Sequence, residues 1–248
     1  MYFNDTHIVY YILFGLLGLI MGQFVDWCCQ RLSEHKKVFS KELWTEYIRY
    51  FKPNYMLMSI TTIIYLLLVY FTGIQVKGFI YNIELIKYAV LIPLLLISFI
   101  IDMKKKIIPN RLSLTIFEIG LIFTFIYGTF NINLAIDMLI GMLIGGGIFF
   151  LIAIIGKLFS QKEAMGLGDV KLMIGLGLFF GSFNITIISI LSFVIAAIVS
   201  LILLITKKKK ATEYIAFAPF IVIASFIIIF VPVEVIMGII LKIFSLGI

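Results

Sequence analysis

Long apolar stretches dominate the pattern of hydrophobic and polar positions along the chain. A helix of about 20 apolar residues crosses a hydrocarbon core of about 30 Å, whereas membrane barrel strands are about half as long and alternate in polarity. The pattern therefore predicts membrane-spanning α-helices. The apolar runs lie near residues 8–25, 56–72, 85–101, 112–130, 134–156, 172–206 and 214–231.

The run 172–206 is too long for one crossing, and GSFN at 181–184 is the natural place for a hairpin. Dividing it there gives an all-α, polytopic bundle of about eight transmembrane helices, forming a single integral membrane domain over residues 1–248. A last apolar stretch, 235–248, is short and carries Lys242, which favours a position at the membrane interface over a crossing.

Composition supports a membrane protein and excludes an ordinary soluble domain. The chain is 62% hydrophobic and 13% charged, against roughly half and a quarter in soluble domains. The first run lacks a basic start and a small-residue cleavage site, so we expect it to be retained.

Basic residues are concentrated in alternate connections between the apolar runs. Because such connections stay in the cytoplasm, we expect the N-terminus on the outer side of the membrane. The net charge of +7 then reflects topology and attraction to anionic membrane lipid, with no need for nucleic acid. The basic connections are 30–55, 104–111, 157–171 and 207–210, whereas the intervening ones hold only Lys77 and Lys87.

Connection 30–55 is the one sizeable cytoplasmic loop. Apolar residues recur there at helical spacing, which predicts a short amphipathic helix on the membrane surface or a simple tether. Cys28 and Cys29, just before it, are adjacent and point in different directions along a helix. They therefore provide neither a disulfide framework nor a CxxC zinc site, and we interpret them as packing residues.

Ionisable residues in or beside the central helices are few, and each needs a reason because burial in the membrane is costly. Asp137 fits the start of the fifth helix, and Glu118 could line a water-filled cavity. The full set is Asp26, Asp102, Glu118, Asp137, Glu163, Asp169 and Lys171.

Asp102 ends the third helix in FIIDMKKKIIPNRLSL, where Pro109 stops a regular helix and Asn110 can cap the next one. Asp169 reaches the same membrane face in MGLGDVKLM, at the start of a short sixth helix. The purely structural alternatives are pairing of Asp102 with its neighbouring lysines and an N-cap role for Asp169.

Two glycines favour a functional site over these alternatives. Gly166 and Gly168 permit unusual backbone conformations and the close approach of another chain. Lys171 beside them would otherwise be a snorkelling anchor.

Two such carboxylates can hydrolyse a peptide bond without a metal. Held close together they share one proton, so that the ionised group activates water and the protonated group polarises the carbonyl. The sequence leaves open which aspartate is the base and which the acid.

At these residues the chain resembles the type IV prepilin peptidases, bacterial membrane aspartyl proteases of the GxGD class. GLGDVKL at 166–172 is similar to their central motif, and DMKKKIIPN at 102–110 to their first aspartate motif. GLIMGQFVDWCCQRL at 18–32 and AFAPFIVIAS at 216–225 resemble their terminal segments.

The resemblance implies that Asp102 and Asp169 are the catalytic pair and that Gly166, Gly168, Lys171, Pro109 and Asn110 shape the motifs. It implies prepilin or pseudopilin substrates, cleaved after a short basic leader at the cytoplasmic face of a bacterial plasma membrane.

The chain departs from this family at two places. Loop 30–55 lacks the CxxC pairs of many members, so no zinc is expected and S-adenosylmethionine-dependent methylation is in doubt. Gln23 and Asp26 replace the usual Ser and Asn. The rival function is a small ion-coupled transporter using the same acidic residues, although no internal repeat supports it.

Overall fold

The computed structural model describes residues 2–3, 6–34, 36–38, 52–73, 79–160, 166–206, 215–236, 238 and 242. Apart from a short hairpin of two-residue strands, β1 (Tyr2–Phe3) and β2 (Thr6–His7), the described elements are helical. The all-α prediction is therefore confirmed. The helices are α1 (Ile8–Ser33), α2 (Tyr55–Thr72), α3 (Phe79–Lys105), α4 (Asn110–Phe130), α5 (Ile132–Ser160), α6 (Leu167–Ile205) and α7 (Ala218–Phe230).

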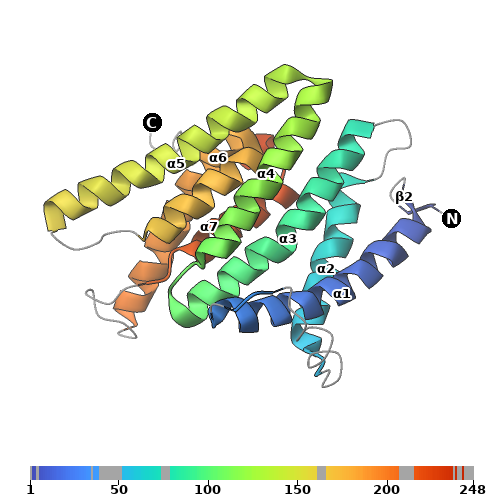
Figure 1. The fold of residues 1–248 in the computed structure, drawn as a ribbon, viewed down its shortest axis with the longest axis horizontal. Coiled ribbons are helices and arrows are strands. Elements are labelled where there is room, and N and C mark those ends of the chain that lie inside the picture. Colours follow the sequence, from blue (N-terminus) through green and yellow to red (C-terminus); the bar gives the residue numbers. More distant parts are fainter. Residues whose placement is uncertain are drawn as a thin grey trace.

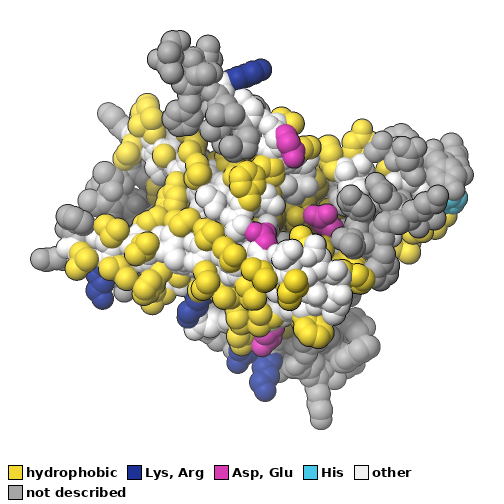
Figure 2. Space-filling view, turned by 90° about the horizontal axis from the view of Figure 1, so that it is seen from above, with side chains coloured by type: hydrophobic (Ala, Val, Ile, Leu, Met, Phe, Trp, Pro, Cys, Tyr) yellow, Lys and Arg dark blue, Asp and Glu magenta, His cyan; other side chains and the backbone are white. Residues whose placement is uncertain are grey.

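Helices α1 to α6 are each long and apolar enough to cross a membrane. Figure 1 shows α1 and α2 at one edge of the bundle, α5 at the other, and α3 and α4 between them. Apolar side chains remain on the outside: Phe125 is 76% exposed and Leu158 75%, and Figure 2 shows hydrophobic side chains over much of the visible face. An apolar exterior around a packed interior is what lipid requires, so the chain is a polytopic helical membrane protein.

Helix α6 reverses direction in its middle. Gly181 there has φ 75° and ψ 179°, a conformation that favours glycine. Gly145 of α5 approaches both halves, because a Cβ on it would lie 2.7 Å from the Met173 carbonyl oxygen and 2.9 Å from Ile185. Met173 and Ile185 are thus at one level, on antiparallel segments 167–180 and 182–205. The predicted hairpin at 181–184 is confirmed.

Asp137 stabilises this reversal. Its carboxylate accepts hydrogen bonds from the Ser182 hydroxyl and from the Ser182 backbone N–H, at 3.3 and 3.4 Å. The sequence assigned Asp137 to the N-terminus of its own helix, but the structure shows that it caps the second half of α6 instead.

Pro93 interrupts the hydrogen bonding of α3 without exposing a polar group. Proline has no N–H, so the carbonyl four residues earlier loses its helical partner. That carbonyl, of Ala89, accepts a hydrogen bond of 2.6 Å from the Tyr65 hydroxyl of α2. The bond ties α2 to α3 at the level of the proline.

Lys87 lies inside α3, not in a connection as the count of basic residues assumed. It is buried, with its ammonium 4.6 Å from the ring centroid of Tyr88 and 5.3 Å from that of Tyr127. Such cation–π contacts compensate for burial of the charge. Lys87 therefore does not belong to an outer connection. The excess of basic residues in the predicted cytoplasmic connections over the predicted outer ones is larger as a result.

Several predictions from the sequence fall on residues outside the described ranges. These are the amphipathic helix, most of which would occupy 39–51, together with Glu163, the lysines at 207–210, and most of 235–248.

Candidate active site

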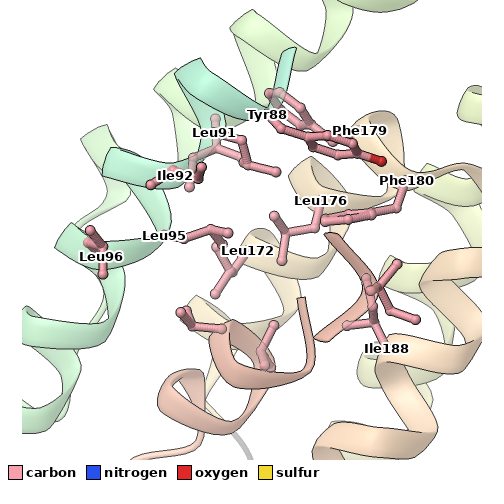
Figure 3. Packing of buried hydrophobic residues seen from close by; sticks show 14 of the residues in the cluster. Tyr88, Leu91, Ile92, Leu95, Leu96, Leu172, Leu176, Phe179, Phe180 and Ile188 are labelled. Carbon is pink, nitrogen blue, oxygen red and sulfur yellow. The ribbon is translucent and has the colours of Figure 1, made fainter. Parts of the chain in front are cut away.

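An apolar seam between α3 and the first half of α6 leads to the two aspartates. The rings of Tyr88 and Phe180 meet with centroids 5.8 Å apart at one end. Figure 3 shows Leu95 of α3 facing Leu172 and Leu176 of α6 farther along. The two helices are antiparallel, so positions on facing surfaces run in opposite directions along the sequence.

The same two faces carry Asp102 and Asp169. Residues seven apart share a helix face, and Asp102 follows Leu95 by seven residues while Asp169 precedes Leu176 by seven. Both side chains are buried, at 3% and 4% exposure, and the charge of Asp102 acts on Asp169. The structure thus brings together two carboxyl groups 67 positions apart in sequence, at one end of the bundle.

Asp102 has a partner that the sequence did not suggest. Its Oδ2 accepts a hydrogen bond of 3.1 Å from the backbone N–H of Ala218. Ala218 is the first residue of α7, where helix N–H groups lack internal partners. Pro219 is typical of a first helical turn. It was the sequence feature that indicated a helix start, and therefore a backbone donor, at this position. Lys105, one of the lysines expected to pair with Asp102, instead donates a hydrogen bond to the Ser33 carbonyl at the end of α1.

Asp169 is not an N-cap. Gly166 occupies that position, no side chain caps the helix, and the Asp169 N–H donates to the Gly166 carbonyl at 3.0 Å. Helix α6 begins at Leu167, two residues before Asp169. The N-cap alternative for Asp169 is therefore wrong, and helix capping does not explain the burial of its carboxyl group.

Neither glycine of GLGD has unusual backbone angles, and Gly168 matters because it lacks a side chain. Gly166 has φ −70° and ψ 136°, which any residue adopts, and Gly168 is helical. A Cβ on Gly168 would lie 3.2 Å from the Cβ of Ile108. The 106–109 turn thus lies close to α6 at Gly168, whereas the conformational argument was wrong for both glycines.

The two aspartate motifs also meet through polar side chains at the bundle end. Lys171 donates to Asn110 Oδ1 at 2.8 Å, and both residues are exposed. Asn110 is the first residue of α4, whose N-cap is Pro109 without any side-chain cap bond. The predicted capping role of Asn110 is therefore wrong, and its amide instead links α4 to α6.

Ser113 adds a buried hydroxyl near this end of α4. Its Oγ has no hydrogen-bond partner among the described residues. Ser113 shares a helix face with Gly120, on which a Cβ would meet Leu178 of α6 at 2.8 Å. The hydroxyl therefore faces α6. Nothing in the sequence separates this serine from other helical serines.

Gln23 and Asp26, the residues that depart from the family pattern, hold α1 against the start of α2. Gln23 Oε1 accepts from the Asn54 N–H at 3.0 Å, and Asp26 Oδ1 accepts from the Asn54 amide at 2.8 Å. Glu118, by contrast, is exposed on α4 and lines neither described pocket, so the cavity suggested for it is not found in the described part of the chain.

Comparison with known proteins identifies the stretch that contains both aspartates. Residues 89–201 match the sequence model of the Type IV leader peptidase family. This matched stretch, somewhat less than half of the chain, is similar to the type IV leader peptidases. The matched stretch begins in α3 and ends in the second half of α6, so it includes both motifs and all of the seam except Tyr88.

Named relatives agree with this similarity. A prepilin leader peptidase/N-methyltransferase of Aeromonas hydrophila is 30% identical over 127 residues, or 51% of this chain and 43% of the relative. Those of Legionella pneumophila and Escherichia coli (strain K12) are 31% and 29% identical, over 58% and 52% of this chain and 49% and 55% of the relatives. The chain thus spans about half the length of the relatives it matches. No solved structure gives a significant match.

The two cysteines of α1 pack in the interior of the bundle. Cys28 and Cys29 are both buried in α1, and within the described ranges no three or more His, Cys, Asp or Glu side chains are grouped as metal ligands. Their burial supports the interpretation of the cysteines as packing residues. The pair of carboxyl groups is the arrangement in this region with evident chemistry.

Proposed function

We propose that the chain is a membrane aspartyl endopeptidase that removes the short basic leader of type IV prepilins or pseudopilins. The observation that carries this proposal is the meeting of Asp102 and Asp169, both buried, at the end of the α3–α6 seam. The match of residues 89–201 to the leader peptidase family supports the substrate class.

In the proposed mechanism, the two carboxyl groups share one proton. The ionised one removes a proton from water, which attacks the scissile carbonyl carbon, while the protonated one donates a hydrogen bond to the carbonyl oxygen. The C–N bond then breaks as the leaving nitrogen takes a proton from the pair, which restores the shared-proton state. The Ala218 N–H fixes one oxygen of Asp102, which orients the carboxyl group without consuming the proton. The two aspartates titrate as a pair, so the roles of base and acid stay interchangeable.

The proposed topology places this site at the cytoplasmic face of the membrane. With α6 divided at Gly181 and α7 included, the chain would cross eight times and leave its N-terminus outside. The ends of α1, α3 and α5 nearest the site carry Arg31, Lys104, Lys105 and Lys157, which supports this orientation. A basic leader would then remain in the cytoplasm while the following hydrophobic helix stays in the bilayer.

The first segment of α6 is short enough to admit water to this depth. Residues 167–180 extend roughly 21 Å at 1.5 Å per residue, less than the hydrocarbon thickness of about 30 Å. Local thinning or burial among longer helices is therefore required. Hydrolysis needs a water molecule beside the dyad, and the short segment provides a route for it.

Co-expression with epitope-tagged prepilin candidates tests the proposal. We expect a mobility shift from leader loss for at least one candidate, and no shift for the same candidate with its cleavage-site glycine replaced. If prepilins, pseudopilins and flagellin-like precursors all remain uncleaved in cells with normal amounts of the protein in the membrane, the proposed function is wrong.

A further inference from the structure

A second site lies on the face of α3 that points away from the aspartates. A groove of about 810 Å³ runs between α1 and α4 with α3 as its floor, within the size range of ligand pockets. Val90, Leu94 and Ile97 of α3 line it. Asp102 follows Ile97 by five residues, which turns it about 140° away around the helix, and neither Asp102 nor Asp169 lines the groove.

The groove is apolar along its length and open to the side. Phe14, Met21 and Phe24 of α1 form one wall, and Ile119 belongs to the α4 wall. The lining residue Ile86 is 51% exposed, so the groove communicates with the lipid that surrounds the helices. Hydrocarbon chains suit such a surface, because no buried polar group would lose a hydrogen bond to water.

One end of the groove carries two positive charges. Lys37 and Arg111 both line it and are both exposed. The backbone at Lys37 is held over the end of α1, because Arg31 Nε donates to the Lys37 carbonyl at 3.2 Å and Trp27 Nε1 to the Val38 carbonyl at 3.1 Å. Among the described residues neither cation has an acidic side chain within ion-pair distance.

We propose that this groove binds an anionic diacyl phospholipid, with its phosphate between Lys37 and Arg111 and its acyl chains along α3. Basic pockets between transmembrane helices at the cytoplasmic side are suited to acidic headgroups, and this end is the one proposed to face the cytoplasm. The hydrophobic helix of a substrate would also fit the apolar part. Its basic leader, however, would meet two cations of the same sign, so charge complementarity favours the lipid.

Native mass spectrometry of the purified full-length chain tests the site by binding, independently of any peptidase activity. The protein is titrated in detergent with phosphatidylglycerol or with phosphatidylcholine of the same acyl chains. We expect the Lys37→Gln/Arg111→Gln double variant to bind phosphatidylglycerol about 25-fold more weakly, since each cation near the lipid charge contributes roughly fivefold. Binding of phosphatidylcholine is expected to change little.

Two further variants separate charge from the groove itself. Lys52→Gln/Lys157→Gln removes the same charge from exposed positions outside the lining, and it is expected to retain lipid as the parent does. Val90→Trp fills the groove without changing charge, and it is expected to weaken binding of both lipids.

Three results would overturn the proposal. The first is equal retention of the two lipids by the parent protein, and the second is an equal loss in the Lys52→Gln/Lys157→Gln control. The third is displacement of phosphatidylglycerol by a peptide containing a prepilin leader and its hydrophobic helix, which would make the groove a substrate site.

Discussion

The carboxylate of Asp102, at the end of α3, accepts a hydrogen bond from the backbone N–H of Ala218, 3.1 Å away in the first turn of α7. The two residues are 116 positions apart. Helix α7, which overlaps the family-like segment 216–225, therefore contributes a backbone donor to the candidate active site, in addition to covering it. Because a backbone donor is fixed by the helix, it can hold a carboxyl group in one orientation.

We predict that Ala218→Pro lowers leader cleavage about tenfold to a hundredfold, because it removes the N–H that holds Asp102. This range follows from the contribution of a hydrogen bond to a charged group. Ala218→Gly keeps the N–H and is the matched control, expected to retain most activity. Rates of cleavage are measured with purified protein in detergent, together with the midpoint of thermal unfolding. Equal rates for the two variants would show that the hydrogen bond is unimportant.

We predict that Gly168→Ala lowers activity severalfold by pushing the 106–109 turn away from α6. The added Cβ would lie 3.2 Å from the Cβ of Ile108, and such overpacking typically destabilises a protein by about 1–3 kcal/mol. Gly147→Ala is the control, because a Cβ there has no neighbour within 4 Å. Cleavage assays and thermal unfolding of the two variants are compared. If they behave alike, close packing at Gly168 is not what the motif requires.

The sequence predicted the helices and the meeting of the aspartates well, because both follow from strong local patterns. Apolar runs mark the helices, GSFN marks the reversal at Gly181, and basic residues assign Asp102 and Asp169 to one end. The partners could not be predicted in this way. The bonds from Ala218 to Asp102 and from Lys171 to Asn110 depend on the rotation of packed helices, which sequence spacing does not determine.

Cap assignments failed for a related reason. Asn110 and Asp169 are residue types that commonly cap helices, and each lies within three residues of a helix start. The actual N-caps are Pro109 and Gly166, and the Asn110 side chain accepts a hydrogen bond from Lys171 instead. Local preference was thus overridden by contacts between helices, as it also was for Asp137, which caps the second half of α6.

We predict that a cysteine at position 104 faces the cytoplasm and one at position 133 faces outward. Lys104 and Asn133 are both exposed, at opposite ends of the bundle. In a Cys28→Ala/Cys29→Ala background, an impermeant thiol reagent should label the Asn133→Cys variant in intact cells and the Lys104→Cys variant only after the cells are opened. The reverse pattern would put the site on the wrong side for a cytoplasmic leader.

We predict that the mature substrate carries a free, unmethylated N-terminus. The chain has two cysteines, adjacent and buried in α1, so it cannot form the CxxC pairs found in the first loop of many bifunctional members. Mass spectrometry of the N-terminal peptide of the cleaved substrate measures the added methyl group. A quantitative methyl group that depends on this protein and on added S-adenosylmethionine would show that the chain also performs the transfer.

The central claim is that Asp102 and Asp169 form one catalytic pair, and single isosteric substitutions test it most directly. Asp102→Asn and Asp169→Asn each remove one carboxyl group while preserving its shape, so neither variant can share a proton between two carboxylates. Glu118→Gln changes an exposed acidic residue of α4 and is the matched control. All three should reach the membrane in normal amounts, with thermal unfolding close to that of the parent.

The deciding measurement is the rate of leader removal from a purified prepilin by each variant in detergent. We predict that both aspartate variants lose at least about a thousandfold in rate, as expected when either member of a catalytic unit is removed, while Glu118→Gln keeps the parental rate. Cleavage near the parental rate by a folded Asp102→Asn or Asp169→Asn protein would contradict the assignment.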